Sequence, residues 1–352
     1  MFTQLLAAEP AAIRVGGELL AQGALVGFPT ETVYGLGANA LDAEAVKRIF
    51  IAKGRPQDNP LIVHVAQTED AFLYGKETPL ARKLAEAYWP GPMTLLMRKD
   101  PVIPDVTTAG LPTVALRCPN HPVALELIRE ARVPVAAPSG NLSGRPSPTT
   151  AAHMYADMAG RIPLILDGGP CRVGVESTVV DVTGDVPVVF RPGGITPAMI
   201  SAVAGKCRVA DSVMRPLKEG EEAPSPGMKH RHYAPRGRLT VVCGEAEKVI
   251  ARVCEMYDES GSACILCADR HLKRYAPRRA VGFGDTDAQA ARSLFALLRQ
   301  MDDMGVERIV CEGCEAEGVG LAVMNRLARA AAFDVVNADA EKTDRDGSDP
   351  RT

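Results

Sequence analysis

The chain has 352 residues, an apolar fraction of 46% and a formal net charge of −3 at pH 7. This length favours two domains of ordinary size, each able to bury a core. The charge excludes a global positive field of the kind that binds nucleic acid tightly, and no apolar run is long enough to span a bilayer.

The first two hundred residues alternate strand-like and helix-like segments. The N-terminal stretch contains Glu9 and no basic segment, so we expect no secretory signal. A buried strand is predicted at 24–28, followed by a helix with Asp42 as its N-cap and Gly54 as its C-cap. Further strands are predicted at 61–65, 95–97, 113–117, 133–137, 164–166, 177–182 and 188–191. The alternation predicts an α/β sheet domain over residues 1–206.

Residues 207–238 are charged, rich in proline and glycine, and without apolar periodicity, which predicts a linker or a long functional loop. A second α/β pattern follows, with strands at 239–243, 263–267 and 308–311 and helices at 246–257, 288–301 and 321–333. It predicts a smaller Rossmann-like domain over 239–336. The polar tail 337–352 is expected to be disordered.

Two cations flank Gly54 where the first predicted helix ends. Lys53 on its own could simply complement the helix dipole. Arg55 precedes Pro56, where the chain must be extended, so its guanidinium projects from a rigid corner. We expect both side chains at an exposed helix end.

The strand at 113–117 carries Thr113 and Arg117 on one face and apolar residues on the other. The polar face could line a cleft, or it could belong to a half-exposed antiparallel strand and simply be solvated. His64 lies in a buried strand, where a lone histidine is more typical of a core residue than of a ligand.

Polar loops follow several of the predicted strands, although neither a Walker A loop nor a GxGxxG fingerprint is present. The loop at 137–150 suits phosphate or carboxylate binding, but an ordinary Ser/Gly turn has the same composition. In open α/β sheets such strand ends are where ligands bind. The polar side chains at these positions are Thr30, Glu31, Thr32, Tyr34, Ser139, Asn141, Ser143, Ser147, Ser177 and Arg191.

Nine cysteines without an export signal indicate reduced thiols and a cytoplasmic protein. Cys264 and Cys267, with Cys311 and Cys314, could be interpreted as a four-thiolate zinc site. The gap of about forty residues is far longer than in compact zinc ribbons, and an apolar strand holds the first pair. Structural, buried cysteines are therefore the favoured interpretation.

A series of segments, in order from about residue 10 to 333, resembles the threonylcarbamoyl-AMP synthase family in its two-domain form. They are FPTETVYGLG, AKGRPQDNPLIVHV, WPGPMT, TVALRCP, APSGNLSGRPSPT, ESTVVD, FRPGG, SPGMKHRHYAP and GVGLAVMNRLARAA. One departure is Gly140, where the family usually has alanine. The resemblance implies an open, twisted mixed sheet with flanking helices in the first domain.

The resemblance also implies a threonine pocket beside an ATP pocket, with Lys53 between them and Lys53 and Arg55 as the catalytic cations. Arg117 would take the carboxylate of threonine. The linker would fold back over the opening as a lid, mobile without ligand and ordered over ATP. The threonine pocket would consist of Thr32, His64, Arg117, Ser177 and the backbone near Ala137. The ATP pocket would consist of Arg55, Asn59, Thr113, Ser139, Asn141, Ser147 and Arg191, with His230, His232 and Tyr233 from the linker.

The implied reaction condenses ATP, L-threonine and bicarbonate into threonylcarbamoyl-adenylate and pyrophosphate, for threonylcarbamoyladenosine in tRNA. Mg²⁺ would arrive with ATP, no metal would be held by protein ligands alone, and a tRNA-threonylcarbamoyl transferase complex would accept the product. Direct tRNA binding is expected to be weak or absent. Two alternatives stay open: a carbamoyl-adenylate-forming enzyme acting on carbamoyl phosphate, and an RNA-binding module without catalysis, against which the net charge of −3 argues.

Overall fold

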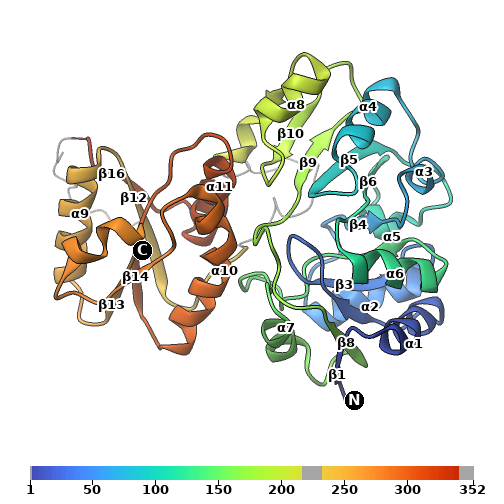
Figure 1. Ribbon diagram of the computed structural model, residues 1–352, viewed down its shortest axis with the longest axis horizontal. Coiled ribbons are helices and arrows are strands. Elements are labelled where there is room, and N and C mark those ends of the chain that lie inside the picture. Colours follow the sequence, from blue (N-terminus) through green and yellow to red (C-terminus); the bar gives the residue numbers. More distant parts are fainter. Residues whose placement is uncertain (1, 216–231, 341–352) are drawn as a thin grey trace, which may run out of the picture.

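The computed structural model describes residues 2–215 and 232–340, which form two α/β domains lying side by side (Figure 1). The first domain contains an 11-stranded sheet and the second a five-stranded one. None of the helices in these two ranges is long and apolar enough to cross a membrane.

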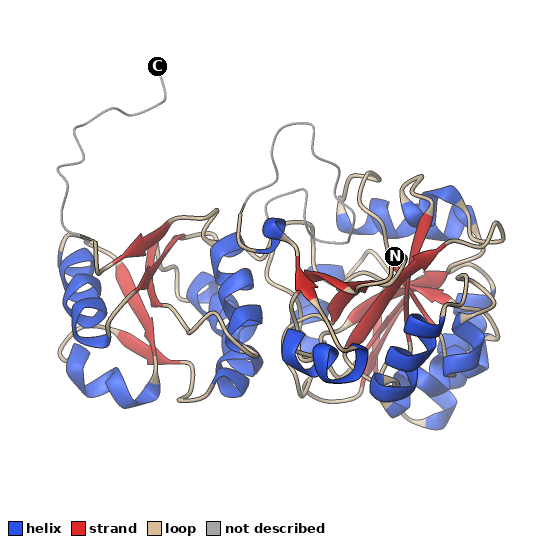
Figure 2. Cartoon of the chain, turned by 90° about the horizontal axis from the view of Figure 1, so that it is seen from above, coloured by secondary structure: helices blue, strands red, loops and turns tan. Residues whose placement is uncertain are grey.

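The sheet of the first domain is open and mixed, as predicted. Its strands fan out along its length (Figure 2). It contains antiparallel pairs, such as β2 (Val26–Phe28) with β3 (Gly35–Asn39), and parallel pairs, such as β4 (Ile62–His64) with β6 (Thr113–Arg117). In spatial order the strands are β1 (Gln4–Ala7), β8 (Leu164–Asp167), β2 (Val26–Phe28), β3 (Gly35–Asn39), β7 (Val135–Ala136), β4 (Ile62–His64), β6 (Thr113–Arg117), β5 (Met93–Arg98), β9 (Thr178–Asp181), β10 (Val188–Arg191) and β11 (Arg208–Val209).

The helices of this domain flank the sheet. The predicted caps of α2 are confirmed: the Asp42 side chain accepts hydrogen bonds from the backbone N–H groups of Glu44 and Ala45, and Gly54 ends the helix in the left-handed conformation at φ 62°. The helices are α1 (Pro10–Ala21), α2 (Ala43–Lys53), α3 (Thr68–Ala71), α4 (Pro79–Tyr88), α5 (Asp105–Thr108), α6 (Pro122–Ala131), α7 (Ala151–Met158) and α8 (Pro197–Ala204).

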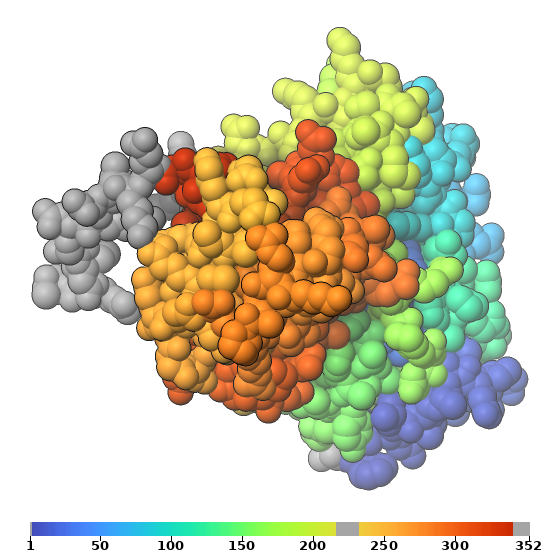
Figure 3. All heavy atoms as spheres, turned by 60° about the vertical axis from the view of Figure 1, so that its left-hand side comes forward, coloured from blue at the N-terminus to red at the C-terminus, as the bar shows by residue number. Residues whose placement is uncertain are grey.

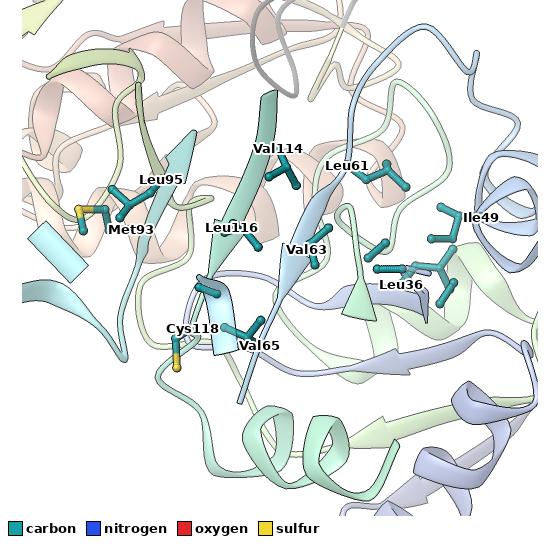
Figure 4. Close-up of a cluster of buried hydrophobic side chains, with 14 of the residues drawn as sticks. Leu36, Ile49, Leu61, Val63, Val65, Met93, Leu95, Val114, Leu116 and Cys118 are labelled. Carbon is teal, nitrogen blue, oxygen red and sulfur yellow. The ribbon is translucent and has the colours of Figure 1, made fainter. Parts of the chain in front are cut away.

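One face of the central strands packs into the main core. Val63 of β4, with Val114 and Leu116 of β6, points into a buried cluster with Leu95 of β5 and residues of α2 (Figure 4). Because side chains alternate along a strand, the next residues of β4 and β6 face the opposite side of the sheet. The polar side chains of the site are on that opposite side.

The second domain is the predicted smaller α/β unit, with a fully parallel sheet in the order β14-β13-β15-β12-β16. β15 lies between β12 and β13, an order that the alternation of elements in the sequence does not reveal. Its elements are β12 (Arg238–Cys243), α9 (Ala246–Asp258), β13 (Ala263–Cys267), a 3₁₀ segment η2 (Asp269–Tyr275), β14 (Ala280–Gly282), α10 (Asp287–Asp303), β15 (Arg308–Glu312), α11 (Gly320–Ala330) and β16 (Val335–Asn337).

Helices α10 and α11 cover the face of the second domain that meets the first, and the two domains touch directly (Figures 1 and 3). Val33 and Val175 of the first domain belong to the same buried cluster as Phe295 of α10. Gly174 has φ +85°, and a Cβ there would lie 2.4 Å from the carbonyl oxygen of Ala291, so the two backbones can approach this closely only at a glycine.

The segment predicted as a linker begins with ordered structure. β11 pairs with β10, and a 3₁₀ turn η1 (Asp211–Val213) follows. Residues 216–231, which include His230, lie outside the described residues, and so does most of the predicted tail, 341–352. The start of that tail, Asn337, is the last residue of β16.

Candidate functional site

A small cavity of about 60 Å³ lies where the strands of the first domain end and the second domain begins. It receives residues from the loops after β2 and β7, from β4 and β6, from the stretch before β9 and from the end of β10. The site residues predicted from sequence that line it are Thr32, Arg55, His64, Arg117, Ala137, Ser139, Asn141, Ser177, Arg191, His232 and Tyr233.

Arg117 is buried at the end of β6, so its strand face is not the solvated one of the alternative interpretation. Its Nη1 donates to the hydroxyl of Thr32 at 3.0 Å, and its Nε donates to the carbonyl of Gly91 at 3.2 Å. Its Nη2 lies 2.7 Å from a carboxylate oxygen of Glu31, and both side chains are almost fully buried. Glu31 is therefore a counter-ion that the sequence interpretation did not assign.

His64 stands beside Arg117 in register on the neighbouring strand β4. Burial first, and the nearby charge of Arg117 second, lower the pKa of His64 to about 3. Its ring makes an edge contact with Phe28, and within the described part of the chain its Nδ1 has no hydrogen-bond partner. His64 is thus a neutral imidazole in the cavity wall, and its buried Nδ1 could bind a polar group of a ligand.

Ser177 and Arg191 form a second polar corner. Arg191 donates from Nε to the carbonyl of Ser177 at 3.0 Å and from Nη2 to its hydroxyl at 3.1 Å. The same hydroxyl lies 2.8 Å from that of Thr94. Burial, more than any neighbouring charge, lowers the pKa of Arg191 to about 10, which leaves the guanidinium charged at neutral pH.

Lys53 differs from expectation because it is buried rather than at an exposed helix end. Its Nζ donates to the carbonyls of Ser139 and Asn141, each at 2.5 Å. Burial, followed by the charge of Arg55, lowers the pKa of Lys53 well below its ordinary value. The main partners of the Lys53 ammonium group are therefore two carbonyls and not the helix dipole, and its hydrogen bonds hold the loop after β7 in place.

Arg55 is half-buried and lines the cavity, and its hydrogen bonds to other described residues are long, at 3.3 and 3.4 Å to the carbonyls of Asn59 and Pro60. Burial lowers the pKa of Arg55 to about 10. Asn59 is buried next to Pro60, which lines the cavity. Thr113 lies at the opposite end of β6 from Arg117 and is not among the lining residues.

Ser147 reaches the cavity through Glu176, which sequence interpretation missed. The hydroxyl of Ser147 donates to Oε1 of Glu176 at 2.5 Å, and Glu176 lines the cavity. Oε2 accepts from Nε of Arg326, in α11, at 2.8 Å. The signal for both residues was present in the quoted motifs, since Glu176 opens ESTVVD and Arg326 lies in GVGLAVMNRLARAA.

A larger cavity, of about 740 Å³, lies at the carboxyl ends of the parallel strands in the second domain, but no site residue predicted from sequence lines it. Its walls carry more carboxylates than cations, which makes it a poor receptor for phosphates. The acidic and basic lining residues are Glu245, Asp285, Asp287, Glu312 and Glu315, with Arg270 and His271.

Three of the four cysteines considered for zinc are buried: Cys264 and Cys267 lie within β13, as the apolar strand predicted, and Cys311 lies within β15, whereas Cys314 is half-buried. Burial raises the pKa of Cys267 to about 12. In residues 2–215 and 232–340 there is no group of three or more His, Cys, Asp or Glu side chains that could hold a metal ion.

Comparison with known proteins adds independent findings. Residues 18–193 match a family model described as "Telomere recombination", and residues 195–332 match one described as "Threonylcarbamoyl-AMP synthase, C-terminal domain". A threonylcarbamoyl-AMP synthase of Pyrococcus abyssi is 48% identical over 328 residues, covering 92% of this chain and 95% of the relative. One of Bacillus subtilis is 45% identical over 343 residues, covering 95% and 97%. The crystal structure of P. abyssi Sua5 complexed with L-threonine superposes with a TM-score of 0.89 and 45% identity, covering 95% of this chain and 99% of that one.

Proposed function

This chain belongs to the threonylcarbamoyl-AMP synthase family, and we propose that it condenses ATP, L-threonine and bicarbonate into threonylcarbamoyl-adenylate and pyrophosphate. The amine of threonine attacks bicarbonate, or CO₂ derived from it, and forms an N-carboxylate with loss of water. An oxygen of this N-carboxylate then attacks the α-phosphorus of ATP, and pyrophosphate leaves.

The observation that carries this proposal is the convergence of cations on one cavity. The buried Arg117 and Arg191 and the half-buried Arg55 line it, and the buried Lys53 holds the loop beside it. Keeping guanidinium groups away from water costs free energy unless an anion or hydrogen-bond acceptors repay it. A carboxylate and a phosphate are both anionic and repel each other. Their reaction therefore needs positive charge and alignment from the enzyme more than it needs a covalent intermediate.

The threonine half of the cavity would be the corner of Thr32, His64, Arg117, Ala137 and Ser177. Arg117 supplies charge for the carboxylate of the substrate, and its own contacts with Thr32 and Gly91 fix the guanidinium plane. The neutral ring of His64 leaves Nδ1 for a polar group of the substrate without adding a second charge. L-Threonine is the ligand in the solved P. abyssi structure.

The ATP half would use Arg55, Arg191 and the hydroxyl and amide groups of the loop after β7, with Asn59 beside it. Thr113, at the far end of β6, would be reached only by a part of the nucleotide that lies outside this cavity. The cavity of about 60 Å³ is below the range of about 300–1,000 Å³ usual for small-molecule sites, so residues of its wall must move when the nucleotide binds. His232 and Tyr233 form that wall on the side of the second domain, and His230 would join them from the segment outside the described residues.

Mg²⁺ would come as part of the ATP substrate. The two carboxylates beside the cavity already have counter-ions, Glu31 with Arg117 and Glu176 with Arg326, so they are poor candidates for a resident metal site. A magnesium ion on the phosphates would neutralise part of their charge.

The product would pass to a tRNA-threonylcarbamoyl transferase complex in the cytoplasm, with direct tRNA binding weak or absent. The net charge of −3 supports the last point, and nine free thiols are compatible with a reducing compartment.

The test is pyrophosphate release from ATP by the purified full chain, with and without threonine and bicarbonate. Release that needs both substrates is expected. A carbamoyl-adenylate-forming enzyme would instead respond to carbamoyl phosphate, and an RNA-binding module would release none. Either of those results would refute the proposal.

A further inference from the structure

The second domain places a charged side chain in the first domain's cavity wall. Arg326 of α11 is fully buried. Its Nε donates to Oε2 of Glu176 at 2.8 Å, its Nη2 donates to the backbone carbonyl of Glu176 at 3.3 Å, and its Nη1 donates to the side chain of Asn325 at 2.8 Å. An arginine this deeply buried is held by a specific counter-charge, and that counter-charge belongs to the other domain.

The negative charge of Glu176 opposes the binding of a polyanion in this site. Burial alone raises the pKa of Glu176, but the charges of Arg326 and Arg191, with the Ser147 hydroxyl, hold it below its ordinary value. The carboxylate is therefore ionised, and on its own it would repel triphosphate. With the guanidinium of Arg326 on one oxygen and the Ser147 hydroxyl on the other, its charge is compensated and its geometry fixed.

Arg326 also supports the cavity wall. Its guanidinium lies 5.7 Å from the ring centre of Tyr233, and that ring packs against Phe295 of α10 at 5.2 Å. Tyr233 has φ 64°, a left-handed conformation that is strained for a tyrosine and that the surrounding contacts must maintain.

Two further contacts hold α11 in position. Asn325 donates to the carbonyl of Val213 at 2.5 Å, and Arg329 donates to that of Ser212 at 3.1 Å. From α10, Arg299 donates to the carbonyl of Pro146 at 2.6 Å, beside Ser147. The loop that carries Ser147 is thus held from α10 directly and from α11 through Glu176.

We propose that Arg326 is a positioning residue of the adenylation site: it neutralises Glu176 and fixes Ser147 and Tyr233, so that the cavity accepts the phosphates of ATP. The second domain then completes the site from outside the catalytic domain. This inference rests on the proposed function, since it concerns the ATP half of that site.

The test compares Arg326→Met, Arg326→Lys, Glu176→Gln and the double variant Glu176→Gln/Arg326→Met in the full chain. For Arg326→Met we expect the KM for ATP to rise about tenfold or more, with the KM for threonine changed less than about threefold, because an uncompensated carboxylate then faces the phosphates. Lowering the pH should reduce the rise as Glu176 protonates. The double variant should return the KM for ATP to within about threefold of the Glu176→Gln single variant, since the unpaired charge is gone.

Arg292→Met is the matched control. Arg292 of α10 also bonds across the domain boundary, to the carbonyl of Arg172 at 3.0 Å, and does not line the cavity, so its KM for ATP should stay at the wild-type value. Arg326→Lys keeps the charge and should fall between wild type and Arg326→Met, and it keeps the test usable if the methionine variant does not fold.

An unchanged KM for ATP in Arg326→Met, or a defect that Glu176→Gln does not relieve, would overturn the inference in favour of a purely structural role. Calorimetric binding of a non-hydrolysable ATP analogue to the same variants gives the comparison without turnover. A wild-type chain that binds the analogue but releases no pyrophosphate would refute the proposed function and still decide the role of Arg326.

Discussion

Replacing Arg117 tests the threonine pocket, but the structure decides which replacement is informative. Alanine would leave Glu31 buried without its counter-ion, and breaking a buried ion pair costs about 3–5 kcal/mol, a large part of the ~5–15 kcal/mol that holds a domain folded. Arg117→Ala would therefore mix unfolding with lost binding. Arg117→Lys keeps a positive charge for Glu31 and removes the planar fork that matches a carboxylate.

The expected loss for Arg117→Lys is one charge-assisted contact to the substrate, about 1.5–3 kcal/mol, which corresponds to a rise of about 10- to 150-fold in the KM for threonine. The KM for ATP should change less than about threefold, because Arg117 lies at the corner with Thr32 and His64. The assay is pyrophosphate release with each substrate varied in turn, with thermal unfolding as the folding control. Equal changes in both KM values would mean that the threonine pocket is assigned wrongly.

Three further predictions follow from the site. Arg55→Ala should abolish adenylate formation with a normal unfolding temperature, because the hydrogen bonds of Arg55 to described carbonyls are long; a folded, active Arg55→Ala would contradict the catalytic assignment. Lys53→Met should lose activity, and its free energy of unfolding should fall by about 2 kcal/mol or more, because two carbonyls are left unpaired. The free energy of unfolding should fall as the pH drops from about 6.5 towards 3, because the unfolded chain protonates the His64 ring and the folded chain does not. His64 alone should contribute up to about 1.4 kcal/mol per pH unit. His64→Gln should reduce this slope when the free energy of unfolding is measured by denaturant titration at each pH, and an unchanged slope would count against a neutral buried ring. A chain that ends near Val209 should still bind threonine by calorimetry and turn over ATP much more slowly, and full-rate turnover by that fragment would show that the second domain contributes nothing to the site.

The sequence predicts the fold well where the pattern is local. The strand 113–117 has the bounds of β6, and both caps of α2 are as expected, because alternation and capping depend on a few neighbouring residues. β3 was missed because its sequence, GLGAN, has two glycines and resembles a loop; it becomes a strand only by pairing with β2 and β7. The position of β15 between β12 and β13 likewise depends on tertiary packing.

For the site, the motifs supplied candidate residues, many of which line one cavity, but not their surroundings. Lys53 was expected to be exposed because lysine at a helix end usually is, and only the fold shows the Ser139 and Asn141 carbonyls around it. Glu31 stood inside a quoted motif, and its role became visible once β6 brought Arg117 within 2.7 Å. The pairing of Glu176 with Arg326 joins residues 150 positions apart, and no spacing rule reaches that far.

The shared hydrophobic cluster at the domain boundary has a consequence for cooperativity. Because Val33 and Val175 pack with Phe295, neither domain can unfold without exposing apolar surface of the other. Each domain should then be stabilised by the other, so the fragment that ends near Val209 should unfold at a lower temperature than the full chain. Ligands that bind the first domain should slow amide hydrogen exchange in α10 and α11, since opening those helices exposes the shared cluster.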